Sequence, residues 1–298
     1  MAKLRSILMP IAIIAGILLP QAHVLSPAMP FLIGAMMFLT FVTKIPPQTH
    51  GYTFKIEIRA FIVSLLLVAA LWGIVTLFHL PREVLLGGAI IALCPPANAA
   101  PAMAKMLGGS ASLALKIFLS GHLIACFSIP IIYGYLTGTD SALFDIALKI
   151  FNSIQPIISI PLAFALGLRA FYPELADRAA KFQKYTIHLW TFSVFVILAK
   201  ASFDIRQMGF MDLWNNGTLP MMAIVSLVLC VLQFSLGWFC ERGRRPIEGS
   251  QSMGQKNTTL VIWIASLYAG PVAAIAPTCY VVWQNLVLSY MTVKIKKE

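Results

Sequence analysis

Long apolar blocks follow one another along this chain, and they limit the folds that it can adopt. Blocks of about 17 residues or more, each long enough to cross a lipid bilayer as a helix, recur along the whole length. Charged residues make up 11% of the sequence and hydrophobic residues 59%, whereas soluble domains carry about 25% charged residues. The sequence therefore predicts an all-α polytopic membrane protein whose first partner is the lipid bilayer.

We expect ten transmembrane helices, joined by short connections, in a single membrane unit over residues 1–298. The expected spans are 6–25, 29–43, 60–79, 84–106, 112–136, 145–168, 184–201, 219–240, 251–269 and 272–292. Five spans fall in a first repeat, residues 1–140, and five in a second, residues 141–298. Because five is an odd number, the second repeat is inverted in the membrane relative to the first.

Positive charge is distributed unequally between the two sets of connections. With the N-terminus inside, the outer positions hold only Arg82, Lys200 and Arg206. The inner positions hold Lys3, Arg5, Lys44, Lys55, Arg59, Lys105, Arg169, Arg178, Lys181, Lys184, Arg242, Arg244, Arg245, Lys294, Lys296 and Lys297. The positive-inside rule therefore predicts an integral protein of a bacterial inner (plasma) membrane with both termini in the cytoplasm. The net charge of +11 sits in these short connections without an aromatic-basic recognition module, so nucleic acid is not expected as a partner.

Two of the expected spans are interrupted at corresponding places in the two halves. The fourth span carries three prolines within residues 94–101, which deny the backbone its regular hydrogen bonds and break the helix. The ninth span carries a polar run, residues 254–259, that includes Lys256. A charge at membrane depth is costly and usually faces a cavity or a partner. Inverted repeats with interrupted helices at matching positions indicate the binding site of a secondary transporter.

The same stretches resemble a known family. Residues 257–260, 270–277 and 282–285 are similar to the last two spans of the bile acid:sodium symporter family, residues 94–115 to its fourth span and the start of its fifth, and residues 30–41 to its second. The resemblance implies two inverted five-helix repeats, a panel of the first, second, sixth and seventh spans, and a core in which broken helices 4 and 9 cross. It also implies that an organic anion binds beside the crossing and two sodium ions behind it.

The family's sodium ligands are not retained in this sequence. The third-span glutamine has no counterpart between residues 51 and 80, and the other ligand positions fall on Ala100, Pro101, Ala114, Phe118, Ser252 and Lys256. Sodium, like its divalent relatives, prefers oxygen ligands, and alanine, proline and phenylalanine side chains offer none. We therefore expect transport that does not depend on sodium, with sodium or proton coupling as the alternative.

Lys256 admits three interpretations. Its ammonium could replace the second sodium ion as a tethered cation, or pair with the substrate, because helix C-terminal carbonyls at the crossing would otherwise be uncompensated. Burial disfavours a charged lysine, so the side chain could instead load and release a proton. It could also extend to the inner surface of the membrane. Ser252 belongs to the same ion-site replacement.

Two asparagines are our first candidates for substrate contacts. Asn98 and Asn257 each stand where a half-helix begins, and the free N–H groups of a helix N-terminus favour anionic groups. Both could equally cap their own half-helices. Thr258 and Thr259 could bind substrate or bond to the preceding turn.

Three further polar residues lie inside spans. Gln284 and Asn285, on the tenth span, match family positions near the substrate cavity, and they could equally bond neighbouring helices. His122, midway along the fifth span, is either a proton carrier or a hydrogen-bonded packing residue.

The function predicted from these features is secondary transport of a small organic anion by alternating access. An enzyme is not expected, because HExxH and paired intramembrane aspartates are absent from the sequence, and no nucleotide motif or cofactor is expected either. The alternative from another class is a membrane sensor that has kept the fold of a transporter without moving its ligand.

Overall fold

The chain is described by a computed structural model that covers residues 2–43, 54–138 and 143–295. All of the regular elements in these ranges are helices. In chain order they are α1 (Ala2–Leu18), η1 (Pro20–Ala28), α2 (Met29–Phe41), α3 (Lys55–Leu77), α4 (Arg82–Leu93), α5 (Ala100–Met106), α6 (Ala111–Ser128), η2 (Ile129–Tyr133), α7 (Gly134–Thr137), α8 (Leu143–Phe171), α9 (Pro173–Ala180), η3 (Lys181–Tyr185), α10 (Thr186–Gln207), α11 (Phe210–Asn215), α12 (Thr218–Cys240), α13 (Pro246–Gly254), α14 (Thr258–Tyr268) and α15 (Gly270–Ile295). The expected boundary between repeats, 140/141, lies outside the described residues.

Within the described ranges, 7 segments are long and apolar enough to cross a membrane: Pro20–Phe41, Lys55–Leu77, Ala111–Thr137, Phe144–Phe171, Pro173–Gln207, Thr218–Cys240 and Gly270–Val293. Leu8–Leu18 and Thr258–Tyr268 are shorter apolar helices. Large apolar side chains such as Phe31, Leu77 and Phe144 are exposed on the outside of the bundle, as lipid-facing residues are. These features are those of a polytopic helical membrane protein.

The ends of several helices differ from those expected. The first span was expected to reach residue 25, but α1 ends at Leu18 and a 3₁₀ segment, η1, follows it. Pro20 and Pro27 lie at the start and near the end of this segment and lack the N–H groups that a continuing α-helix needs. By contrast, α12 begins and ends within one residue of the expected span 219–240.

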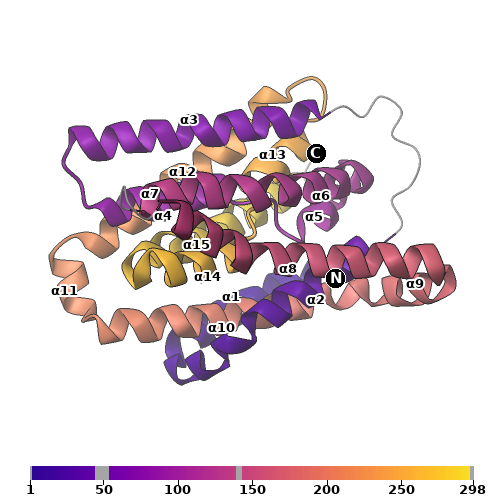
Figure 1. Cartoon of the computed structure of the whole chain (residues 1–298), viewed down its shortest axis with the longest axis horizontal. Coiled ribbons are helices and arrows are strands. Elements are labelled where there is room, and N and C mark those ends of the chain that lie inside the picture. The colour runs from indigo at the N-terminus through magenta and orange to yellow at the C-terminus, as the bar shows by residue number, and fades with distance from the viewer. Residues whose placement is uncertain (1, 44–53, 139–142, 296–298) are drawn as a thin grey trace.

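The helices form two packed groups. In one group α1 and α2 pack on α10, and α2 also packs on α8. In the other, α3 and α12 pack on α4, and α12 packs on α13 and α15. Figure 1 shows α3 at one edge of the molecule and α10 near the opposite edge, with α14 and α15 between them. The two broken helix pairs, α4/α5 and α13/α14, lie in this interior.

A close backbone contact places α13 against α12. A Cβ atom on Gly237 would overlap the carbonyl oxygen of Gly249, and one on Gly249 would overlap that of Gly237. Small residues at such contacts allow two membrane helices to approach backbone to backbone. This contact holds α13, and with it the start of the second break, inside the bundle.

Candidate site at the crossing of two broken helices

The first break separates α4 from α5. Helix α4 ends at Leu93, and α5 does not begin until Ala100. Pro95 and Pro96 have no N–H to continue the ladder of α4, so the helix stops there regardless of its surroundings. Pro101 falls in the first turn of α5, where a missing N–H costs nothing.

The second break separates α13 from α14 and contains no proline. Helix α13 ends at Gly254 and α14 begins at Thr258, with Gln255 in an extended conformation between them. No local residue forces this interruption as proline forces the first. The contacts that the segment makes with other parts of the chain must therefore maintain it.

The two breaks bond to each other in antiparallel fashion. The N–H of Ala97 donates to the carbonyl oxygen of Gln255 at 2.8 Å, and the N–H of Asn257 donates to that of Pro95 at 2.9 Å. Non-helical backbone is tolerated at membrane depth only where it is buried in protein or lines a water-filled cavity. The pairing of residues 95–97 with residues 255–257 meets that requirement.

Lys256 lies in the middle of this pairing and is 4% exposed. Its Nζ donates to the carbonyl oxygens of Cys94, at 2.9 Å, and Ala92, at 3.2 Å, at the C-terminal end of α4. The last carbonyls of a helix lack intrahelical partners and carry a partial negative charge, which a cation stabilises. The ammonium therefore caps α4 from the opposite half of the chain and does not extend to the surface.

Two side chains of helix α15 donate to or accept from the backbone at the second break. The side-chain oxygen of Gln284 accepts a hydrogen bond from the N–H of Lys256 at 3.0 Å. The hydroxyl of Tyr280 donates to the carbonyl oxygen of Gly254, the last residue of α13, at 2.8 Å. Both side chains are fully buried. They satisfy backbone groups that the interruption of the helix would otherwise leave without partners.

His122 connects α6 to the crossing. Its Nε2 lies 3.3 Å from Nδ2 of Asn257, and its Nδ1 lies 2.8 Å from the carbonyl oxygen of Phe118. Both contacts are satisfied together when Nδ1 carries the proton and Nε2 accepts from the amide of Asn257. This is the geometry of the packing role, and it occupies the amide nitrogen of one of the two asparagines that we expected to contact substrate.

Several buried polar atoms at the crossing have no protein partner. They are Asn98 Oδ1, Gln251 Oε1, Ser252 Oγ, both side-chain polar atoms of Gln255, Thr258 Oγ1 and Gln284 Nε2. Each buried polar atom without a hydrogen-bond partner lowers the stability of the fold by about 1–3 kcal/mol. Several such atoms gathered at one place call for an explanation such as bound water or a bound ligand. Asn98, Ser252, Thr258 and Gln284 are residues that the sequence predicted as part of the site.

Two predicted residues stand apart from this group. The amide of Asn285 donates to the carbonyl oxygen of Val281 in its own helix at 2.7 Å, which is a contact within α15. Thr259 is buried in the first turn of α14. Among the described residues, no three His, Cys, Asp or Glu side chains gather as metal ligands would.

A cavity of about 50 Å³ opens between α3, α6 and the crossing. Its polar lining consists of Glu57 and Ser64 from α3, Ser128 from α6, and Ser252 and Lys256. A cavity needs about 10–15 Å³ to hold one water molecule, so this one has room for roughly three or four. A whole organic anion would require the surrounding helices to move apart.

Sequence reasoning missed Glu57. We expected residues 44–59 to form a connection, but α3 begins at Lys55 and places Glu57 in its first turn, 3% exposed. The hydroxyl of Ser120 donates to its carboxylate at 2.7 Å. A sequence signal was available, because Glu57 and Ser64 are seven residues apart and so lie on one face of a helix.

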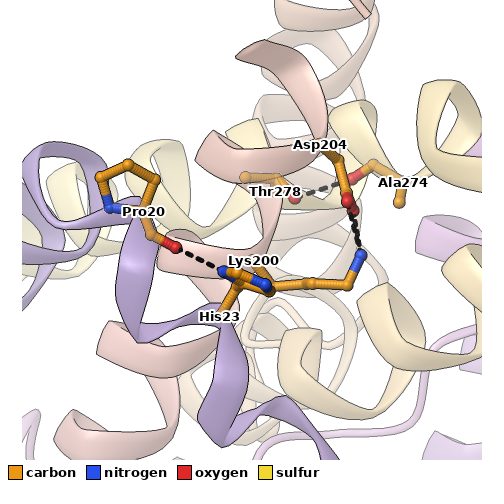
Figure 2. Close-up of polar contacts among 6 residues, drawn as sticks. All are labelled: Pro20, His23, Lys200, Asp204, Ala274 and Thr278. Carbon is orange, nitrogen blue, oxygen red and sulfur yellow. Dashed lines mark hydrogen bonds and ion pairs between the residues drawn. The ribbon is translucent and has the colours of Figure 1, made fainter. Parts of the chain in front are cut away.

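A second group of polar residues lies away from the crossing, near the C-terminal end of α10. There Lys200 and Asp204 form an ion pair at 2.5 Å, and Figure 2 shows them near η1 and α15. Nδ1 of His23, in η1, bonds to the carbonyl oxygen of Pro20 at 3.0 Å, and the ring of His23 stacks on Phe203. The polar groups drawn in Figure 2 thus have local partners, unlike the unpartnered polar atoms at the crossing.

No protein-family model matches the sequence, and a comparison with curated proteins finds no match. The fold and the apolar helices define the chain as a polytopic helical membrane protein. Its most distinctive feature is a buried crossing of two interrupted helices that contains a lysine.

Proposed function

We propose that this protein is a secondary transporter of small organic anions that works without sodium, with the ammonium of Lys256 in place of a bound cation. The observation that carries the proposal is the pair of hydrogen bonds from Lys256 Nζ to the terminal carbonyls of α4. A metal ion at such a place would be held by carbonyl oxygens, and here an ammonium bonds to them. The charge is covalently attached, so it need not be imported with each substrate.

The arrangement of the helices supports the same proposal. We count one pass each for α1, η1 with α2, α3, α4/α5, α6 to α7, α8, α9 to α10, α12, α13/α14 and α15, and leave out the six-residue helix α11. This gives ten passes, the number that the resemblance to bile acid:sodium symporters implies. The packing of α1, α2, α8 and α10 on one another is that expected for a panel. The broken helices fall in the fourth and ninth passes of this count.

The chemistry of the crossing favours an anion. The N-terminus of α14 begins at the break, and Thr258 in its first turn has a buried hydroxyl without a partner. A helix N-terminus and a nearby ammonium both attract negative charge. The buried Nε2 of Gln284 has no partner and supplies a further N–H donor for carboxylate or sulfonate oxygens. The small cavity corresponds to a closed state, and alternating access would open the crossing to each side in turn.

The proposal is tested first by binding and then by movement. Purified protein is screened by thermal shift against cholate, 2-oxoisovalerate and benzenesulfonate, with sodium or with choline as the only cation. A bound anion stabilises the folded protein by mass action, and the same stabilisation is expected with either cation. Protein in liposomes should then exchange the bound anion in a counterflow assay without sodium. Binding without exchange would identify a sensor, and exchange only with sodium would contradict the role of Lys256.

A further inference from the structure

A groove away from the crossing lies where three helices end or begin. It has a volume of about 590 Å³ and is lined by the C-terminal part of α3, the start of α4 and the short helix α7. Figure 1 shows these three parts of the chain at one end of the molecule. Pockets that bind small molecules measure about 300–1,000 Å³, so this groove is large enough for a ligand. The transport proposed above makes no use of it.

The groove lies where two candidate membrane spans end. Lys55–Leu77 and Ala111–Thr137 both end beside it, on the side that the charge distribution predicts to be the outer one. Trp72 of α3 and Tyr135 of α7 line it and are 57% and 63% exposed. Tryptophan and tyrosine are enriched at the level of the lipid headgroups, because their rings are partly apolar and partly polar. This placement favours a lipid as the ligand.

The lining of the groove changes from apolar to polar along α3. Val75 and Thr76 follow Trp72 by three and four residues and so lie on the same face of the helix, and His79 follows the end of the helix at Leu77. At 1.5 Å per residue, the distance from Trp72 to His79 along the helix axis is about 10 Å. A phospholipid in a bilayer has the same order, with acyl chains toward the interior and a phosphate at the edge.

Arg82 supplies the positive charge of the groove. It is the first residue of α4, and its Nη2 donates to the carbonyl oxygens of Leu136, at 2.6 Å, and Gly138, at 3.2 Å. These bonds fix the guanidinium in the lining and leave the N–H groups of Nε and Nη1 for a ligand. The planar guanidinium matches the geometry of phosphate oxygens. Glu83, the acidic neighbour of Arg82, does not line the groove.

His79 stands at a position that would suit glycine. Its φ of 51° is the one positive φ of a non-glycine residue in the described ranges 2–43, 54–138 and 143–295. A side chain is strained in this left-handed region, whereas glycine is not. The groove gives the side chain a use that offsets this strain, because a neutral imidazole can donate a hydrogen bond to a phosphate oxygen.

We propose that this groove binds an anionic phospholipid of the adjoining leaflet. The phosphate bonds to Arg82 and His79, and an acyl chain follows the face of α3 past Thr76 and Val75 toward Trp72. The bound lipid joins the ends of α3, α4 and α7. Helix α4 leads from this groove to the carbonyl oxygens that Lys256 binds, so the lipid stabilises the other end of that helix. The inference does not depend on transport.

The experiment counts bound lipids on the full-length protein by native mass spectrometry. Protein in detergent is stripped of lipid and titrated with palmitoyl-oleoyl phosphatidylglycerol or with phosphatidylcholine of the same chains. We expect one phosphatidylglycerol to bind more tightly than any further copies, and several-fold more tightly than phosphatidylcholine, whose choline brings a positive charge toward Arg82. Equal affinity for the two lipids, or no single tight site, would contradict the proposal.

Three variants locate the tight site. Arg82→Gln removes the charge and should weaken it about tenfold. Arg206→Gln is the matched control, because Arg206 is predicted on the same side and also donates to a backbone carbonyl, that of Ile17; it should bind lipid as wild type does. Thr76→Trp fills the groove without changing its charge and should abolish tight binding. Wild-type affinity in Arg82→Gln or Thr76→Trp, or an equal loss in Arg206→Gln, would place the lipid elsewhere and overturn the proposal.

His79→Gly separates recognition of the lipid from stability. The change relieves the strained backbone, so the melting temperature of the lipid-free protein should stay the same or rise. The affinity for phosphatidylglycerol should nevertheless fall, because a donor to the phosphate is lost. Unchanged affinity together with a lower melting temperature would show that His79 is structural and would contradict its part in the site.

Free glycerol 1-phosphate distinguishes a lipid site from a site for soluble phosphate. It carries a phosphate without acyl chains, so at millimolar concentration it should not displace the tightly bound phosphatidylglycerol. Full displacement would show that the groove recognises phosphate alone, which contradicts a lipid site.

Discussion

The two breaks at the crossing have the same shape but are produced by different means. The first, between α4 and α5, is determined by local covalent chemistry, because Pro95 and Pro96 cannot donate backbone hydrogen bonds. The second, between α13 and α14, contains Gln255, Lys256 and Asn257, all of which could continue a helix. Its interruption is maintained by bonds from elsewhere in the fold.

This difference tells us where function can reside. A break made by prolines exists before any partner is present, and apart from Asn98 its residues are small and apolar. A break made by side-chain contacts depends on those contacts, and here they come from Lys256, Tyr280 and Gln284. We therefore expect the removal of a single side-chain group to have a larger effect at the second break than at the first.

The largest effect is expected from Lys256→Met. The change removes the positive charge from the crossing and leaves the oxygens of Ala92 and Cys94 without their donor. At an effective dielectric constant of 20, the loss of a charge about 6 Å from an anion costs about 3 kcal/mol, so the affinity for the anion should fall about a hundredfold. Thermal shift against benzenesulfonate measures this. Lys105→Met, an exposed lysine on α5, is the control and should bind normally.

A steric change should be the most damaging one at the first break. A Cβ atom on Gly121 of α6 would lie 2.8 Å from Cδ of Pro96, which is too close. Gly121→Ala should therefore push α6 away from the crossing and lower stability by about 2–3 kcal/mol. Gly167→Ala is the matched control, since nothing lies within 4 Å of a Cβ atom there. Equal loss of melting temperature in both variants would argue against the contact.

Tyr280→Phe should have a moderate effect at the second break. It removes only the hydroxyl that bonds to the carbonyl oxygen of Gly254, which then has no partner in a buried place. The expected loss is about 1–2 kcal/mol in the free energy of unfolding. The comparison is with Tyr290→Phe in the same helix, an exposed hydroxyl whose removal should change nothing. A neutral Tyr280→Phe would mean that α15 does not stabilise the end of α13.

The smallest effect is expected from Pro101→Ala. Pro101 lies in the first turn of α5, where an added N–H has no intrahelical bond to make, and two other prolines still prevent a continuous helix. Stability should change by less than about 1 kcal/mol. Anion affinity should remain that of wild type in the same thermal-shift titration. A large loss of affinity would contradict this expectation, because it would show that Pro95 and Pro96 cannot maintain the first break without Pro101.

The sequence predicted the positions of both breaks because the signals are local. Prolines within residues 94–101 and the polar run at residues 254–259 mark them directly. The partners of Lys256 could not be predicted in the same way, because Ala92 and Cys94 lie more than 160 residues away along the chain. Which carbonyls the ammonium reaches depends on how α4 and α13 pack. The buried Glu57 was missed because it stands between Lys55 and Arg59, and several charged residues beside an apolar run are typical of a connection.

Chemical rescue of Lys256→Ala tests the central claim most directly, namely that a positive charge beside the α4 carbonyls enables the crossing to bind an anion. Benzenesulfonate binding is measured without sodium, before and after methylammonium is added. The account predicts weak binding that methylammonium restores in the variant and does not change in wild type. Binding by Lys256→Ala that equals wild type without any added cation would contradict it.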